Sequence, residues 1–303
     1  MTDEKLKTIF CKPGKQMKKA SKISFLLLAL AIISSGIITE SFAQTTSPVY
    51  SGISSIPRQQ GRTSPYALSS IDEVISVMNA EHLNIWRMSF EPTFNEWRTF
   101  IQYYFDHCSY DLIVEPNHYY YQTLMSDSQW ASGTSRCLEI LEYFSDYQDR
   151  LWIEPQNEQL TDITYETQQF VNAVRGAGYT NNVVSNVFWR PTSITVAFQK
   201  MAQINDPLDK FWTGQHFYFD QISLSSAMNY MQDGLDLGLK MINTEIGADA
   251  RETNYFDQSE VDDLNDFMQW CADRGVGNTV WLMYGDYDYP TYQNFDLEFP
   301  IIT

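Results

Sequence analysis

Short apolar runs alternate with longer helical patterns along the chain from about Ser47 onward. Seven of these runs have the length and the nearly continuous apolar character of strands that are buried on both faces. They are Leu83–Phe90, Asp111–Pro116, Leu151–Gln156, Val183–Trp189, Phe211–Phe217, Lys240–Ile246 and Asn278–Met283. A weaker run at Val49–Ile56 precedes them, so the pattern predicts eight strands.

Between the strands, the spacing of apolar residues changes to that of an amphipathic helix. Two stripes with this spacing are Ile71, Val74, Ile75 and Met78, and Val261, Leu264, Met268 and Cys271. We expect Ser259 to cap the second helix, because Asp262 stands three residues further on, as in a capping box. Strands that alternate with helices predict a parallel sheet covered by helices.

Eight strand–helix units predict an α/β fold. We expect a closed (β/α)8 TIM barrel that forms a single domain. The alternative is an open, doubly wound sheet. The glycine-rich turn that usually marks a nucleotide-binding version of that sheet is missing from the sequence. The chain ends about 20 residues after the last predicted strand, so we expect the final helix to be short or absent.

The first 43 residues have the pattern of a secretory signal. Several lysines precede the apolar run Phe25–Ile33, and the small residues Ser41 and Ala43 occupy the −3 and −1 positions of a cleavage site. An uncleaved anchor is the alternative, although the apolar stretch is shorter than the roughly 20 residues that cross a bilayer. We therefore expect residues 1–43 to be a signal peptide with a long basic leader, residues 44–303 to form the folded domain, and the protein to be secreted.

The chain is strongly acidic. Its net charge is −18, and the predicted leader has seven lysines and three acidic residues, so the remaining chain has a net charge of −22. A surface with this charge repels phosphate backbones, which argues against a nucleic-acid partner. It suits a neutral ligand such as a carbohydrate. We expect no stable protein partner, and contact with a membrane only if the leader is uncleaved.

Cys108, Cys137 and Cys271 lie in apolar helical patterns outside the leader. Their spacing indicates neither a zinc site nor a disulfide framework, so we expect free cysteines that pack in the core. The acidic tail at 285–298 lacks the ligand spacing of an EF-hand calcium loop and is expected to be solvated. We expect no metal and no other cofactor.

Polar and aromatic residues recur near the carboxyl end of one predicted strand after another. They are Arg87, His118, Asn157, Glu158, His216, Tyr218, Glu245 and Trp281. From strand to strand the separations are 29 to 58 residues, which corresponds to one or two barrel units. The active site of such a barrel lies at the carboxyl ends of its strands, so we expect these side chains to share one site.

Glu158 and Glu245 are associated with the fourth and seventh predicted strands, which lie roughly opposite each other across a barrel mouth. Cleavage of a glycosidic bond needs one carboxylic acid to protonate the leaving oxygen and one carboxylate to attack the anomeric carbon or a water. We expect Arg87 to keep the attacking carboxylate ionised, and a less solvated environment to keep the other protonated. The alternatives are a carbohydrate-binding barrel without catalysis, which need not keep both glutamates, and a cell-surface structural protein.

The segments "PQNEQ", "GQHFYFD", "NTEIGA" and "TVWLMYG" contain most of these residues, and the set resembles the eight-residue signature of glycoside hydrolase family 5, a cellulase-type family. The match spans about Asn84 to Tyr284 and fills all eight positions. It implies that residues 44–303 are a retaining β-glycosidase domain acting on a β-linked polysaccharide or oligosaccharide. Glucan or mannan, endo or exo cleavage, and hydrolysis or transglycosylation all stay open.

The resemblance implies a role for each catalytic group. Glu158 would be the acid/base, and Glu245 would be the nucleophile that forms a covalent glycosyl-enzyme. Their carboxyl groups would lie about 5 Å apart, as retaining enzymes require. Arg87 would pair with Glu245, Tyr218 would orient the same carboxylate, and His216 would support Glu158.

The resemblance also implies sugar contacts. Asn157 would hydrogen-bond the sugar 2-hydroxyl, Trp281 would supply a stacking face, and His118 would line the same subsite. The sequence departs from the family where Gln159 replaces a common proline and where Tyr119, in place of asparagine, follows the histidine. These departures affect the expected substrate more than the expected reaction.

Other polar and aromatic residues near the strand ends are less specific. Glu115 and Glu154 lie earlier in their strands, where a paired buried carboxylate and a substrate contact are equally open, and Gln156 is expected to support the site. Further aromatic residues are either sugar platforms or ordinary packing: Trp130, Trp189, Tyr119, Tyr120, Tyr121 and Tyr284.

Overall fold

The structure is a computed structural model that describes residues 49–57, 68–118, 125–159, 161–187, 193–248 and 258–281. The chain divides into two units, Met1–Thr45 and Thr46–Thr303, and every described residue belongs to the second. The predicted signal peptide therefore lies outside the described residues. Within the described part, no helix combines the length and the apolar character that a membrane span requires.

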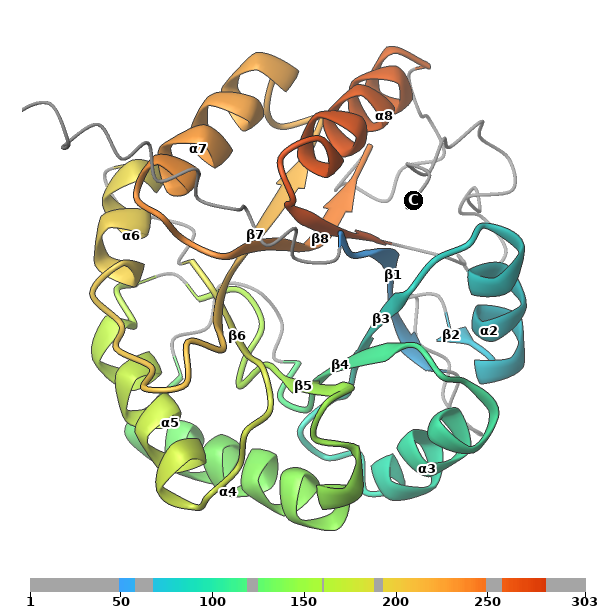
Figure 1. Cartoon of the computed structure of the whole chain (residues 1–303), viewed down its shortest axis with the longest axis vertical. Helices are drawn as coiled ribbons and strands as arrows, with labels where there is room; N and C mark the ends of the chain where they lie inside the picture. The colour runs from blue at the N-terminus through green and yellow to red at the C-terminus, as the bar shows by residue number, and fades with distance from the viewer. Residues whose placement is uncertain are drawn as a thin grey trace, which may run out of the picture. The chain divides into compact units, whose positions relative to one another are not determined.

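Eight parallel strands form a closed barrel. In chain order they are β1 (Ser51–Pro57), β3 (Ile85–Ser89), β4 (Asp111–Glu115), β5 (Leu151–Ile153), β6 (Val183–Asn186), β7 (Phe211–Tyr218), β8 (Met241–Gly247) and β9 (Gly277–Trp281). Each strand pairs with the next in this order, and β9 pairs with β1, which closes the ring (Figure 1). The predicted (β/α)8 TIM barrel is confirmed, and the open doubly wound sheet is excluded.

Seven α-helices occur in the described residues, and Figure 1 shows them around the outside of the strands. They are α2 (Ile71–Ala80), α3 (Trp97–His107), α4 (Asp127–Tyr143), α5 (Thr164–Gly176), α6 (Ile194–Met201), α7 (Leu224–Asp236) and α8 (Gln258–Ala272). Capping boxes begin two of them, with Ser70 accepting from the Glu73 amide and Ser126 from the Gln129 amide. These bonds satisfy amide donors that the first turn of a helix leaves without a partner.

Some boundaries differ from the predicted ones. β5 ends at Ile153, so the polar segment from Glu154 to Glu158 follows the strand. The expected cap at Ser259 is wrong, because α8 already includes Gln258 and places the serine inside the helix.

Two short elements were not predicted. The two-residue strand β2 (Leu68–Ser69) pairs with the end of β1, and the 3-10 turn η1 (Ser145–Tyr147) follows α4. Neither is long enough to produce a periodic pattern in the sequence. The expected short or absent final helix concerns residues 282–303, which lie outside the described part.

The barrel interior is built in layers, because every second residue of a strand faces the same side of the sheet. We call the lowest layer the floor: Ile85, Ile113, Trp152, Val184, Trp212 and Ile242, which form one apolar cluster. Two residues further along the same strands stands the middle layer: Arg87, Glu115, Glu154, Asn186, Gly214 and Thr244. A polar layer therefore lies directly on an apolar one, between the floor and the mouth.

Two larger apolar clusters pack the helices against the outside of the strands. Cys108 and Cys137 belong to one and Cys271 to the other, and all three are buried and free. The prediction that these cysteines are packing residues is confirmed.

Candidate active site

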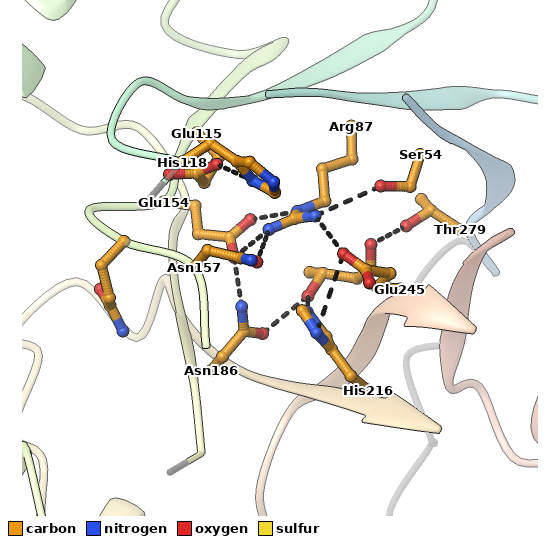
Figure 2. A network of polar contacts seen from close by, with 12 residues as sticks. Ser54, Arg87, Glu115, His118, Glu154, Asn157, Asn186, His216, Glu245 and Thr279 are labelled. Carbon is orange, nitrogen blue, oxygen red and sulfur yellow. Dashed lines mark hydrogen bonds and ion pairs between the residues drawn. The ribbon is translucent and has the colours of Figure 1, made fainter. Parts of the chain in front are cut away.

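Arg87 on β3 is the centre of the polar network of the middle layer (Figure 2). Its side chain is fully buried, and Nε and Nη2 donate to the two carboxylate oxygens of Glu154 at 2.7 and 2.9 Å. It also donates to Glu245 Oε2 at 3.0 Å, to Asn157 Oδ1 at 2.9 Å and to Ser54 Oγ at 3.3 Å. Burial alone lowers the pKa of Arg87, but the charge and hydrogen bonds of Glu154 raise it above its ordinary value. The guanidinium therefore stays charged.

Glu245 on β8 accepts a hydrogen bond at each carboxylate oxygen. Arg87 Nη1 donates to Oε2, and the Tyr218 hydroxyl donates to Oε1. Burial raises the pKa of Tyr218 well above its usual value, so the hydroxyl keeps its proton and acts as a donor. Two donors at two oxygens suit a carboxylate, which can only accept.

Glu158, which follows β5, faces His216 on β7. His216 Nδ1 lies 2.8 Å from Glu158 Oε1 and 3.8 Å from Glu245 Oε2. Burial raises the pKa of Glu158, although the charges of His118 and Arg87 oppose the shift. Burial also lowers the pKa of His216 to about 4, so the imidazole is neutral near neutral pH. The two glutamates thus have different surroundings, which is how paired carboxyl groups acquire different roles.

The spacing of the two glutamates is short. One carboxylate oxygen of each, together with one nitrogen of His216, lie within 4.8 Å of one another. Retaining glycosidases place their two carboxyl groups roughly 5–5.5 Å apart, whereas inverting ones leave about 6.5–9.5 Å for a water.

The same three side chains are, among the described residues, the group spaced closely enough to ligate a metal ion: Glu158, His216 and Glu245. The Arg87 guanidinium already lies 3.0 Å from Glu245 Oε2, so a cation bound there would meet a fixed positive charge. This positive charge disfavours a metal ion between Glu158 and Glu245.

His118 and Trp281 lie beside each other at the mouth, with ring centroids 6.1 Å apart and ring planes 19° from parallel. His118 Nδ1 is 3.0 Å from Glu115 Oε2. Burial alone lowers the pKa of His118, but the hydrogen bond and charge of Glu115 raise it above its ordinary value. Glu115 is thus a paired buried carboxylate, as Glu154 is beside Arg87.

Asn186 and Thr244 extend the network below the mouth, and the sequence analysis missed both. Asn186 Nδ2 donates to Glu154 Oε1, and Thr244 Oγ1 donates to Asn186 Oδ1 at 2.6 Å. Thr244 Oγ1 also lies 3.0 Å from His216 Nε2. A usable signal exists in the sequence, because each polar residue stands two positions after an apolar residue of the floor.

The remaining candidates have other surroundings. Gln156 Nε2 donates to Ser185 Oγ at 3.3 Å, so this amide contacts a neighbouring strand. Trp130, on α4, is buried in one of the two larger apolar clusters. Gln159 is buried and accepts from the Met125 amide. The other aromatic candidates and the acidic tail at 285–298 lie outside the described residues. These aromatic candidates are Tyr119, Tyr120, Tyr121, Trp189 and Tyr284.

No protein-family model matches the sequence. No curated protein matches it either.

Solved structures with the same architecture include endoglucanases and β-mannanases. A triple mutant of the endo-β-1,4-glucanase from Xanthomonas axonopodis pv. citri is 15% identical and aligns over 80% of this chain and 92% of its own, with a TM-score of 0.62. The β-mannanase from Thermomonospora fusca is 15% identical over 82% and 84% of the two chains, with a TM-score of 0.63. Its mannohexaose complex is similar at 15% identity over 79% and 80%, with a TM-score of 0.61. At this identity, the similarity establishes the (β/α)8 barrel fold.

Proposed function

We propose that the protein is a retaining β-glycosidase that hydrolyses a β-linked polysaccharide, with Glu158 as acid/base and Glu245 as nucleophile. The observation that supports this most strongly is the spacing of the two carboxyl groups: one carboxylate oxygen of Glu158 and one of Glu245 lie within 4.8 Å of each other. We further propose that it belongs to glycoside hydrolase family 5 and is exported through residues 1–43.

In the first step, the Glu245 carboxylate attacks the anomeric carbon while Glu158 transfers its proton to the glycosidic oxygen. The bond between the anomeric carbon and the leaving oxygen breaks, and a covalent glycosyl-enzyme forms. The hydrogen bonds from Arg87 and Tyr218 fix the attacking carboxylate in place. A partly buried Glu158 with a raised pKa suits the acid role.

In the second step, Glu158 is a carboxylate and removes a proton from water. The water oxygen bonds to the anomeric carbon, the bond to Glu245 breaks, and Glu158 regains its proton. Two displacements at one carbon retain the β-configuration.

The proposed substrate class is a β-1,4-glucan or a β-1,4-mannan, supported by the names of the structurally similar glycanases. Asn157 Oδ1 accepts from Arg87 Nη2, which directs the amide N–H groups away from the guanidinium, and these donors suit a sugar 2-hydroxyl. Glucose and mannose differ in the orientation of that hydroxyl, so Asn157 is the proposed residue that senses the difference. Trp281 and His118 suit the apolar face of the sugar ring.

The test is reducing-end release from carboxymethyl cellulose, mixed-linkage glucan and mannan by the purified protein. We expect activity on at least one of them and a loss of about 10⁴-fold or more in Glu245→Gln, because the nucleophile is removed. Glu142→Gln removes an exposed carboxylate of α4 and should leave activity unchanged. Full activity in Glu245→Gln would contradict the proposal, as would a folded protein that hydrolyses none of these glycans.

A further inference from the structure

A continuous chain of polar contacts leads from Arg87, through the middle layer, to His216 and Glu158. Figure 2 labels Arg87, Glu154, Asn186 and His216 of this chain. A guanidinium can only donate hydrogen bonds, so the direction of the first link is fixed. Glu154 Oε1 accepts from Arg87 Nη2 at 2.9 Å and also accepts from Asn186 Nδ2. The Asn186 amide therefore points its nitrogen toward the carboxylate.

The orientation of that amide determines the next link. With Nδ2 on Glu154, the amide oxygen of Asn186 faces Thr244, whose Oγ1 lies 2.6 Å away. An amide oxygen only accepts, so the Thr244 hydroxyl donates its one hydrogen to Asn186. Thr244 then has only acceptor capacity for any other neighbour.

That neighbour is His216, whose Nε2 lies 3.0 Å from Thr244 Oγ1. Because Thr244 accepts here, His216 must donate from Nε2. The neutral imidazole has a single N–H, so a proton at Nε2 leaves a lone pair at Nδ1. This lone pair faces Glu158 Oε1 at 2.8 Å.

Two lone pairs at that distance repel, whereas a proton between them makes a hydrogen bond. We propose that Asn186 and Thr244 are positioning residues that hold His216 in the tautomer with its proton on Nε2, so that Glu158 rests in its protonated form. The inference rests on the proposed function for the role of Glu158 as the acid, but the tautomer itself does not.

A glycine makes room for this arrangement. Gly214 on β7 is the register partner of Asn186 on β6. A Cβ atom at Gly214 would lie 2.0 Å from Asn186 Oδ1, a distance that no side chain tolerates, so the amide would have to move. The absence of a side chain at this position keeps the amide oxygen within reach of Thr244.

The same tautomer serves both steps of the proposed reaction. Before cleavage, the proton rests on Glu158 Oε1, and it passes to the glycosidic oxygen as the bond to the leaving group breaks. The Glu158 carboxylate that results faces the Nδ1 lone pair, which disfavours the charged form. This favours uptake of a proton from water, as the second step requires.

Other charged groups act on this pair as well, namely Arg87, Glu115, His118 and Glu245. Glu245 Oε2 is 3.8 Å from His216 Nδ1, beyond hydrogen-bond distance. A proton between His216 and Glu158 reduces the repulsion between the two glutamates, so Glu245 favours the same protonated state.

The direct test is ¹⁵N NMR of the protein labelled at its four histidines, because proton–nitrogen correlations distinguish the two neutral tautomers. His216→Asn identifies the signals of that ring by their loss. We expect the Nε2–H tautomer in the wild type at neutral pH. In Thr244→Val the acceptor at Nε2 is gone, so the proton should move to Nδ1, where Glu158 can accept it, whereas Thr244→Ser should keep the Nε2–H form.

The second readout is the pH profile of kcat/KM on whichever β-glycan responds. In Thr244→Val, Nδ1–H stabilises the Glu158 carboxylate, so the alkaline limb should move to lower pH by about one unit. Thr244→Ser should stay within roughly twofold of the wild type, with an unchanged midpoint. A merely structural role for Thr244 would lower stability and leave the midpoint of the alkaline limb where it is.

The outcomes separate the inference from the proposed function. The Nδ1–H tautomer in the wild type would overturn the inference even if the protein hydrolyses glycans, and this result needs no variant to fold. An alkaline limb in Thr244→Val that coincides with the wild type would also overturn it. The Nε2–H tautomer in a protein that hydrolyses no glycan would leave the inferred proton position supported and overturn the proposed function alone.

Discussion

The floor and the middle layer of the barrel lie next to each other and differ in almost every physical respect. Ile85 and Trp152 belong to the apolar cluster of the floor. Two residues further along the chain from each of them, Arg87 and Glu154 form a buried ion pair. The floor gains free energy from removing apolar surface from water. The middle layer takes charges out of water, which costs free energy unless each charge is paired.

This difference explains why the middle layer is so densely bonded. Each oxygen of Glu154 accepts from Arg87, and Asn186 adds a further donor. A buried ion pair adds little net stability over a well-packed apolar layer, although removing one partner costs much. We therefore expect this layer to be kept for function, because its contacts hold the Glu245 carboxylate and the His216 imidazole in place. The floor below supplies the rigid support.

Among the substitutions that test this difference, we expect the largest loss of stability and activity in the middle layer. Arg87→Met removes the partner of Glu154 and of Glu245 and leaves uncompensated buried carboxylates. We expect the free energy of unfolding to fall by about 3–5 kcal/mol, together with loss of hydrolytic activity. Urea denaturation measures the first and glycan hydrolysis the second.

Arg98→Met is the matched control, because Arg98 pairs with Glu139 on the surface, where the two side chains are 47% and 51% exposed. It should cost about 1 kcal/mol or less. Equal losses in the two variants would contradict the distinction between a buried network and a surface pair.

We expect a smaller change in the free energy of unfolding at the floor, where Asp111 accepts a hydrogen bond from Trp152 Nε1 at 3.0 Å. Burial raises the pKa of Asp111 from 3.8 to about 6, against the opposing hydrogen bond and nearby Arg150. The folded state thus holds this proton more tightly than the unfolded chain does. Its ionisation therefore lowers the free energy of unfolding as pH rises from about 4 to above 6.

Asp111→Asn keeps an acceptor for Trp152 and has no proton to lose. Relative to the wild type, its stability should therefore rise by about 1–3 kcal/mol between about pH 4 and pH 8, with glycan hydrolysis at neutral pH unchanged. Asp146→Asn, on the exposed turn η1, removes the same charge from a solvated position and serves as the control. A stability difference between Asp111→Asn and wild type that is the same at both pH values would contradict this account.

Much of the fold can be predicted from the sequence, because strands buried on both faces appear as apolar runs. The run at Asp111–Pro116 predicts β4 to within one residue, and even the weak run at Val49–Ile56 corresponds to β1. The recurrence of polar residues every one or two barrel units predicts that they meet at one end, and the structure brings Arg87, Glu245 and Tyr218 into contact there. Their catalytic roles remain proposals.

The positions of Asn186 and Thr244 have a signal in the sequence, but their contacts could not be predicted, because these depend on strand register and on its irregularities. The pairing of β8 with β9 shifts between Asn243 and Ile246. Regular alternation would send the neighbours Thr244 and Glu245 to opposite faces, yet both contact residues inside the barrel. Such a bulge has no signal in an apolar pattern.

The central claim is that Glu245 forms a covalent glycosyl-enzyme. The most direct measurement is mass spectrometry of the protein after incubation with dinitrophenyl 2-deoxy-2-fluoro-β-cellobioside or the corresponding mannobioside, which slow the second step so that the intermediate accumulates. We predict one added glycosyl group on the peptide containing Glu245, and none in Glu245→Gln. A glycosyl group on a different residue, or hydrolysis products of inverted configuration with no adduct, would contradict the account.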